Sequence, residues 1–204
     1  MQNTLRKPKE LESPMTHLPH ITRKTAALAV AGLAALALSA AALAGTITAS
    51  ASVTGAGSLG LSHNASATVS AVTIDGTDQS ATWSIPLSIT DARGNGSGWN
   101  ATITSTSFND GAGHSLATTA SSMTGVTSSC VAGGTCTNPT NSETYPLTVP
   151  AAATAPTAVK FFDAAANTGM GRFTVTPSIS VSVPGNVYAG TYSSTVTVAV
   201  ASGP

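Results

Sequence analysis

Charged and aromatic residues are scarce in this sequence. Asp, Glu, Lys and Arg together make up 8% of the 204 residues, and Phe, Trp and Tyr make up 4%. Surface helices need long charged side chains, so this shortage argues against a helical domain. Ser, Thr, Ala, Val and Gly are abundant instead, and β-branched residues interrupted by Gly and Pro favour an all-β fold. A disordered Ser/Thr-rich stalk is the competing interpretation, and the alternation of apolar residues described below argues against it.

Residues that carry catalysis or bind metals are equally scarce. After residue 44 the only imidazoles are His63 and His114, each among small residues. The sequence contains no closely spaced set of zinc ligands and no Gly-x-Ser-x-Gly motif,. Asp110 and His114 are close enough in sequence to hold a cation weakly, but a solvated loop is the favoured interpretation. We therefore predict a protein without catalytic residues, metal or cofactor.

The one long apolar segment lies near the N-terminus. Arg23 and Lys24 precede an uncharged, Ala-rich run that ends in Ala42-Leu43-Ala44. A basic region, an apolar region and a site of small residues together predict a secretory signal peptide, with Ala42 and Ala44 as the residues recognised at the cleavage site. A membrane anchor is the alternative, since the run is about long enough to span a bilayer. Removal of the segment is favoured, because Ala partitions weakly into lipid.

Cleavage after Ala44 would divide the chain into a signal peptide, residues 1–44, and a single exported domain, residues 45–204. The signal peptide has a net charge of +3 and the exported domain a net charge of −3. Three scattered cations cannot neutralise a row of phosphates, so we expect no nucleic-acid partner. We expect contact with the membrane only through the signal peptide, before cleavage. The last residues contain neither an apolar tail nor a sortase-type sequence, which predicts non-covalent retention at the cell surface.

Cys130 and Cys136 are the only cysteines, and both lie in the predicted exported domain. The flexible sequence between them allows a local disulfide, which the oxidising environment outside the cytoplasm favours. A loop this short removes little entropy from the unfolded chain, on the order of 2 kcal/mol. We therefore expect the disulfide to fix a loop and not to hold the fold together.

Alternation with a period of two is clearest near the C-terminus. From Phe173 to Val183 apolar residues share one parity and Ser or Thr the other, with Pro177 on the apolar parity at an expected bend or edge,. After a turn at Pro184-Gly185-Asn186, the pattern returns in Tyr192–Val200,. These two segments predict a pair of antiparallel strands with one buried face.

The same alternation of apolar and polar residues recurs earlier in the sequence, with more interruptions. We expect further strands at Ala67–Ile74, Ala81–Thr90, Trp99–Phe108, Tyr145–Val149 and Ala158–Phe162. The segment 111–141 has few large apolar residues, which predicts a long loop outside the sheets. About seven to nine strands at this spacing favour a single immunoglobulin-like antiparallel β-sandwich.

Trp99 follows a glycine-rich turn that Asp91 and Arg93 bracket. The favoured interpretation is a local salt bridge followed by a strand whose Trp99 fills the core, because sandwiches commonly bury a Trp. The functional alternative is a ring that stacks on sugars at a binding surface.

Two segments resemble motifs of a known family. The ending Tyr192-Ser-Ser-Thr-Val-Thr-Val-Ala-Val-Ala-Ser-Gly-Pro204 resembles the terminal motif of WxL-domain surface proteins, roughly Tyr-x-x-x-aliphatic-Thr-Trp-x-Leu-x-x-x-Pro. Val198 stands in the place of its Trp, and Val200 in the place of its Leu. The segment Asp91-Ala-Arg-Gly-Asn-Gly-Ser-Gly-Trp99 resembles the approach to the family's first Trp-x-Leu, with Ala101 in the place of Leu. The resemblance covers most of residues 45–204.

The resemblance implies an exported, non-catalytic protein of a Gram-positive bacterium that attaches non-covalently to the cell wall, in several family members through peptidoglycan. It implies peptidoglycan and other surface proteins as partners, and Trp99, Tyr192, Val198 and Val200 as binding residues. Val keeps the strand and its apolar face but supplies no aromatic ring for a glycan. The alternative function is a structural subunit of a surface layer, coat or pilus that assembles through the edges of its β-strands.

Overall fold

The computed structural model describes residues 49–55 and 57–204, so the predicted signal peptide and its cleavage site at Ala42 and Ala44 lie outside the described residues. The described chain is all-β. Its ten strands are β1 (Leu59–His63), β2 (Gln79–Ser84), β3 (Leu87–Asp91), β4 (Trp99–Thr106), β5 (Ser121–Cys130), β6 (Leu147–Thr148), β7 (Ala151–Ala152), β8 (Val159–Ala164), β9 (Gly171–Val183) and β10 (Val196–Ser202). Within the described ranges, no helix is long and apolar enough to cross a membrane.

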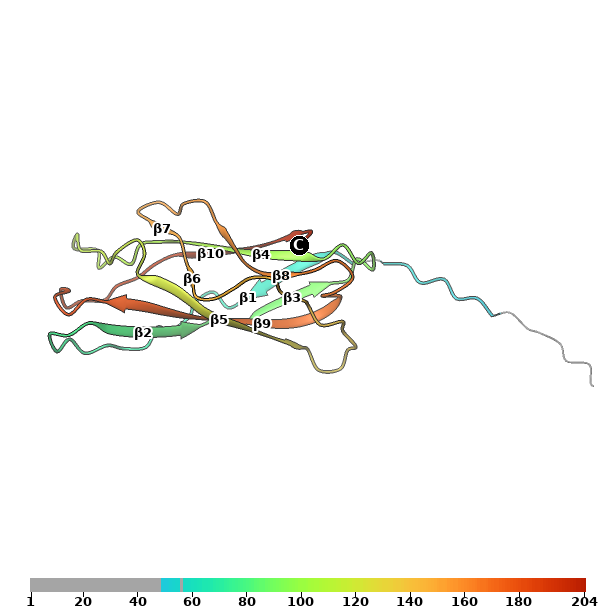
Figure 1. Cartoon of the computed structure of the whole chain (residues 1–204), viewed down its shortest axis with the longest axis horizontal. Helices are drawn as coiled ribbons and strands as arrows, with labels where there is room; N and C mark the ends of the chain where they lie inside the picture. Colours follow the sequence, from blue (N-terminus) through green and yellow to red (C-terminus); the bar gives the residue numbers. More distant parts are fainter. Residues whose placement is uncertain (1–48, 56) are drawn as a thin grey trace, which may run out of the picture. The chain divides into compact units, whose positions relative to one another are not determined.

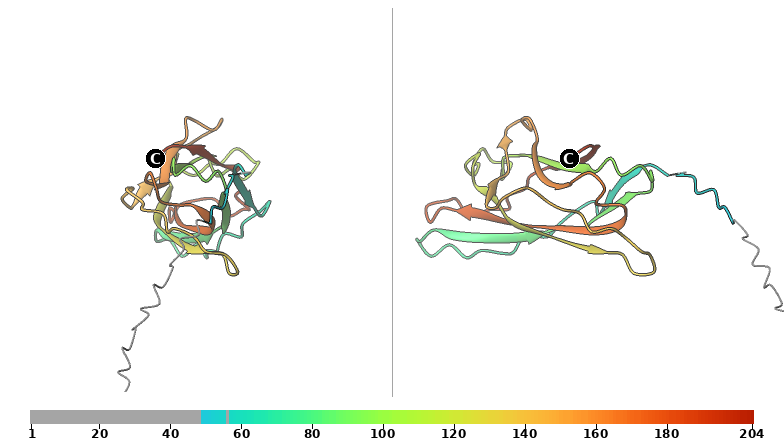
Figure 2. Two further views of the ribbon diagram at one scale, coloured as in Figure 1. Left: turned by 90° about the vertical axis from the view of Figure 1, so that its right-hand side faces the viewer. Right: turned by 45° about the vertical axis from the view of Figure 1, so that its right-hand side comes forward.

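The strands form two sheets that pack face to face, as the end-on view in Figure 2 shows. The larger sheet has the order β1-β3-β9-β5-β6, and β2 also pairs with β9. The smaller sheet is built on β4, which pairs with β10 on one side and with β8 and β7 on the other (Figure 1). The predicted all-β two-sheet sandwich is confirmed, with one parallel pair, β4 with β7, among the antiparallel ones. Its immunoglobulin-like character stays a prediction.

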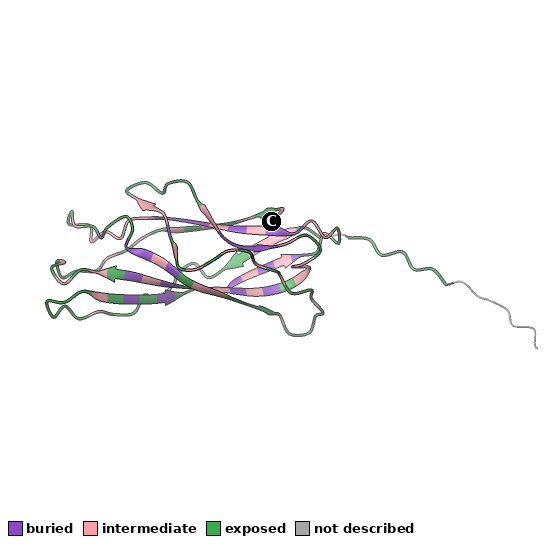
Figure 3. Ribbon diagram, viewed as in Figure 1, coloured by how far each residue is buried: buried purple, intermediate pink, exposed green. Residues whose placement is uncertain are grey.

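Alternation of side chains along the strands places the core between the sheets. In β9 the buried residues Phe173, Val175, Ile179 and Val181 alternate with half-buried or exposed Ser and Thr, a pattern visible as changing colours along the strands in Figure 3. Because successive side chains of a strand point to opposite faces, this period of two sets which face is buried. The sequence prediction for this segment is therefore confirmed.

Pro177 lies in the middle of β9 without breaking it. Val131 N donates to the Arg172 carbonyl and Ser182 N to the Ala120 carbonyl, so even-numbered residues of β9 face the β5 side,. The missing N–H of Pro177 would therefore face the other side, at the point where the neighbour of β9 changes from β3 to β2. No ladder hydrogen bond is lost there.

Several expected strand boundaries are wrong. The segment 67–74 is an extended chain outside the sheets, although Ser70 N donates to the Thr82 carbonyl. The strand expected at Ala81–Thr90 is two strands, β2 and β3, because Ile85-Pro86 interrupts the ladder,. The described residues form ten strands, more than the seven to nine expected, and this number includes the short β6 and β7.

The largest error concerns 111–141, expected as a loop outside the sandwich. This segment contains β5, a ten-residue strand that pairs with β9 along most of its length. Its sequence is rich in Ser, Thr and Gly, and its second half is mostly exposed, so it shows little apolar alternation. The terminal strands also differ from expectation, because β9 and β10 lie in different sheets and do not pair with each other.

Candidate functional site

Trp99, the first residue of β4, lies in the core with 0% of its surface exposed. Its indole N–H donates to the Gly169 carbonyl oxygen at 2.9 Å. Its ring packs against Phe162, with the ring centroids 5.7 Å apart. A ring buried in this way has no surface for a sugar in this structure. The role of Trp99 in this structure is therefore to stabilise the packing between the two sheets.

The turn before Trp99 is held by Arg93. Its guanidinium donates to both carboxylate oxygens of Asp91, each at 2.9 Å, and to the Gly98 carbonyl at 2.6 Å. A further hydrogen bond to Ser202 Oγ connects the turn to the end of β10. Asp91 is 3% exposed, and the hydrogen bond from Arg93 holds the pKa of its carboxyl below the usual range,. The predicted local salt bridge is therefore a clamp between β3, β4 and β10.

The other residues expected from the resemblance lie on or just before β10. Val200 is half-buried and opposes Ala101 of β4. Tyr192 and Val198, by contrast, line a common hollow of about 480 Å³, called here the apolar groove. Its lining also includes Trp83, Ile85, Leu87, Phe108 and Val196. The structure thus brings together two of the four expected residues and places Trp99 elsewhere.

A second hollow, of about 450 Å³, adjoins the apolar groove and is called here the polar hollow. Hydroxyl, amide and small side chains line it: Thr106, Ser107, Asn109, Gly111, Ser115, Ala153, Ser193, Ser194 and Thr195. No charged side chain belongs to this lining. The last three of these residues also line the apolar groove, so one segment separates the two hollows.

Hydrogen bonds keep the polar hollow in shape. Asn109 and Ser193 exchange two backbone hydrogen bonds of 3.0 Å. Ser194 Oγ donates to the Thr106 carbonyl at 2.6 Å, and Thr195 N donates to Thr106 Oγ1 at 2.9 Å. The walls come from the end of β4, the loop after it and the segment before β10. A preformed cleft of this kind loses little conformational freedom when it binds a ligand.

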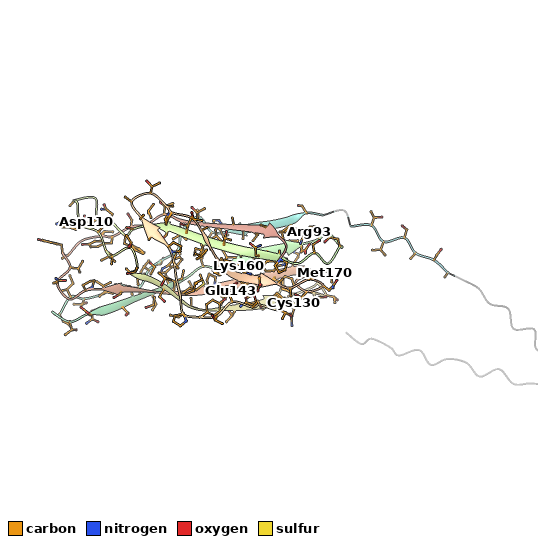
Figure 4. The ribbon with its side chains drawn as sticks, turned by 45° about the horizontal axis from the view of Figure 1, so that its top comes forward. Arg93, Asp110, Cys130, Glu143, Lys160 and Met170 are labelled. Atoms are coloured by element: carbon orange, nitrogen blue, oxygen red, sulfur yellow. A yellow bond between two sulfur atoms is a disulfide. The ribbon has the colours of Figure 1, made fainter. Side chains whose placement is uncertain are left out.

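Asp110 and His114 brace the loop beside this hollow, at the opposite end of the domain from Arg93 (Figure 4). The Asp110 carboxylate accepts hydrogen bonds from the His114 ring at 2.6 Å and from the backbone N–H groups of Ala112 and His114. The bond from the His114 ring lowers the pKa of the Asp110 carboxyl. The His114 ring also stacks on Tyr188, with centroids 3.9 Å apart. These contacts support the loop interpretation, and no cluster of three or more metal-binding side chains occurs among the described residues.

Two of the three cations after residue 44 are held in ion pairs. Arg93 pairs with Asp91, and Lys160 Nζ lies 3.1 Å from Glu143 and 3.3 Å from Asp163 (Figure 4). The third cation, Arg172, is exposed on β9. The described surface therefore offers little positive potential to a polyanion.

Cys130 and Cys136 form the predicted disulfide at the end of β5. The residues that follow each cysteine are attached to the start of β9 and to the residue before it: Val131 N donates to the Arg172 carbonyl, and Thr137 N donates to the Met170 carbonyl. The cysteine loop is thus held by backbone hydrogen bonds as well as by the covalent link.

We expect the double variant Cys130→Ser/Cys136→Ser to remain folded. The short loop predicts a loss in the free energy of unfolding of about 2 kcal/mol. Chemical denaturation followed by circular dichroism, with the oxidised wild type and the reduced wild type side by side, measures the loss. A variant that does not fold would show that the disulfide holds the sandwich together.

Sequence reasoning missed the polar hollow. Its residues come from three separate stretches of chain and are Ser, Thr, Asn, Gly and Ala, which occur throughout the sequence. The turn-forming residues Asn109-Asp110-Gly111 are the one local sequence signal in this region.

Comparison with known proteins identifies the family. A family model described as WxL domain, surface cell wall-binding, matches residues 26–204. No curated protein and no solved structure gives a significant match.

Proposed function

The chain belongs to the WxL-domain family of surface proteins that bind the cell wall, and from this premise we propose that it is exported by a Gram-positive cell and attaches non-covalently to peptidoglycan. The attachment is non-catalytic, and the polar hollow is the contact site. The observation that carries the proposal is the uncharged lining of this hollow, whose hydroxyl and amide groups are arranged before any ligand arrives. Such groups match the hydroxyl and amide groups of glycan strands.

Charge distinguishes peptidoglycan from the other abundant wall polymers. Teichoic acids are polyanions, and a protein that binds them needs unpaired cations. After residue 44 the chain carries three cations against six carboxylates, and Arg93 and Lys160 already have carboxylate partners. Repulsion between like charges therefore disfavours teichoic acid. The involvement of Tyr192, Val198 and Val200 in wall contact stays a prediction from the resemblance.

Co-sedimentation with isolated walls tests the proposal. Purified residues 45–204 are expected to pellet saturably with Gram-positive walls, and to do so equally after teichoic acids have been stripped. Ala153→Arg places a long side chain in the polar hollow and should weaken binding about tenfold or more, a loss of about 1.4 kcal/mol. Ala132→Arg makes the same change at an exposed position of the cysteine loop and is the matched control.

The outcomes separate cleanly. Equal binding by Ala153→Arg and Ala132→Arg would remove the polar hollow from the contact. Loss of binding on stripping would identify teichoic acid as the ligand. Absence of pelleting under all conditions would contradict direct attachment to either polymer.

A further inference from the structure

We propose that the exported protein assembles with itself: residues 46–54 of one copy, called here the donor segment, add as a β-strand to the outer edge of β10 in the apolar groove of a second copy. This assembly is a function beyond wall attachment and does not depend on it.

The donor segment has the sequence pattern of a strand. Its sequence alternates strictly, with Ile47, Ala49, Ala51 and Val53 on one parity and Thr or Ser on the other. From Ala49 onwards its described residues are exposed and belong to no strand. Val53 has 95% of its surface exposed, the most exposed large apolar side chain in the described ranges. A period of two with one apolar face predicts a strand that is buried on one side once it has a partner.

The glycines that follow the donor segment hold the chain at the turn between β3 and β4. Gly57 N donates to the Ala92 carbonyl at 3.2 Å. A Cβ at Gly55 would lie 2.1 Å from the Arg93 carbonyl oxygen, so the chain lies directly against the β3–β4 turn here. Figure 1 shows β1 beginning at this end of the sheets. From here β1 runs to His63, where the lining of the apolar groove begins. A second copy is therefore the occupant that this geometry favours.

The acceptor is the edge of β10 that faces away from β4; among the described strands β10 pairs with β4 only, although β1 lies close to it. Thr106 N donates to the Thr195 carbonyl, and Gly203 N donates to the Gly98 carbonyl. The N–H and C=O groups of odd-numbered residues of β10 therefore face β4, and those of its even-numbered residues point to the other edge. An edge of this kind is a template for another strand.

The same even-numbered residues supply the apolar wall of the groove. Val196 and Val198 are half-buried and line it together with Trp83 of β2. Trp83 is 9% exposed, and its indole N–H is buried without a hydrogen-bond partner. Buried polar groups rarely lack a partner, so this N–H is available to an acceptor that enters the groove. A backbone carbonyl of the incoming strand can accept this hydrogen bond.

The two surfaces also match in charge and size. The donor segment contains no charged residue, and His63 is the one titratable side chain besides Tyr192 in the groove lining. Pairing with the edge of β10 turns one face of the donor segment toward the groove. The small side chains Ala49, Ala51 and Val53 on that face enter it without the desolvation of a charge.

Sedimentation velocity of purified residues 45–204 over a range of concentrations tests the proposal. We expect dimers and longer assemblies that dissociate on dilution. Val53→Asp places a charge on the face that enters the groove and should raise the dissociation constant at least about tenfold. Ser52→Asp makes the same change in charge on the opposite face and should leave assembly nearly unchanged. Val53→Asp should still bind walls like the wild type.

A synthetic peptide of residues 45–55 provides a second measurement. We expect it to bind the domain, shift the Trp fluorescence and shorten the assemblies, and we expect Trp83→Phe to abolish the fluorescence shift. A protein that stays monomeric at every concentration would overturn the proposal. This holds even if the peptide binds, because the donor segment would then occupy the groove of its own copy. Equal effects of Val53→Asp and Ser52→Asp on assembly would also overturn it.

Discussion

Trp99→Ala is expected to lower the free energy of unfolding by about 3–5 kcal/mol, the usual cost of removing a large aromatic side chain from a core. Trp99 has no exposed surface, starts the central strand of the smaller sheet and packs against Phe162. Its removal leaves a cavity and also leaves the Gly169 carbonyl without its hydrogen bond. Urea denaturation followed by far-ultraviolet circular dichroism measures this loss. A loss of this size is a large part of the stability of an ordinary domain.

The variant Trp99→Phe separates packing from hydrogen bonding. It keeps most of the apolar volume but cannot donate to Gly169, so we expect an intermediate loss of about 1–3 kcal/mol. Both variants should bind cell walls normally at temperatures where they are folded, because the ring is buried. If Trp99→Ala keeps its stability but loses wall binding, the ring contacts the wall. The ring must then be exposed in the wall-bound protein, unlike in this structure.

Asp91→Asn is expected to lower the free energy of unfolding by about 3 kcal/mol at neutral pH, at the lower end for a broken buried ion pair. The Asp91 side chain is 1% exposed and accepts both hydrogen bonds from Arg93, whose own side chain is 14% exposed and partly hydrated. An amide keeps the shape of the carboxylate but removes the charge that Arg93 neutralises. The clamp that joins β3, β4 and β10 is thereby weakened.

The effect depends on pH in a defined direction. Arg93 lowers the pKa of Asp91 in the folded protein, so the ion pair stabilises the fold above the usual carboxyl pKa of about 4. This contribution is lost as the pH falls through the lower, folded-state pKa. The difference between wild type and Asp91→Asn should therefore shrink as unfolding is measured from pH 7 down to about pH 2. Asp75→Asn, in an exposed turn, is the control, and an equal loss there would contradict a special role of the clamp.

Much of the fold could be predicted where the signal is local. Phe173, Val175, Ile179 and Val181 show by their parity which face of β9 is buried. Cys130 and Cys136 are six positions apart in the sequence, so their pairing needs no knowledge of the rest of the chain. By contrast, β5 has weak apolar alternation, and its place in the middle of the larger sheet depends on the neighbouring β9. Distant strands pair through backbone groups, and because every residue carries these groups, the sequence does not show which strands pair.

The candidate sites also differ in whether their signal is local in the sequence. Tyr192 and Val198 were indicated by a motif of consecutive residues, and the structure places both in the apolar groove. The polar hollow combines Asn109, Ala153 and Ser193 from separate parts of the chain. Their side chains are ordinary in this Ser/Thr-rich sequence, so only their meeting in space distinguishes them.

The sequence by itself determined the all-β class, the buried face of the terminal strands, the disulfide and the resemblance that led to the family. Each of these depends on side-chain alternation or on residues close together in the chain. The tertiary structure alone decided that Trp99 is enclosed, that β9 and β10 belong to different sheets, that β10 pairs only with β4 among the described strands, and that the indole N–H of Trp83 is buried without a hydrogen-bond partner. The physical reason is that enclosure and strand order are settled by contacts between segments far apart in the sequence, whereas a strand's pattern is settled by its own residues.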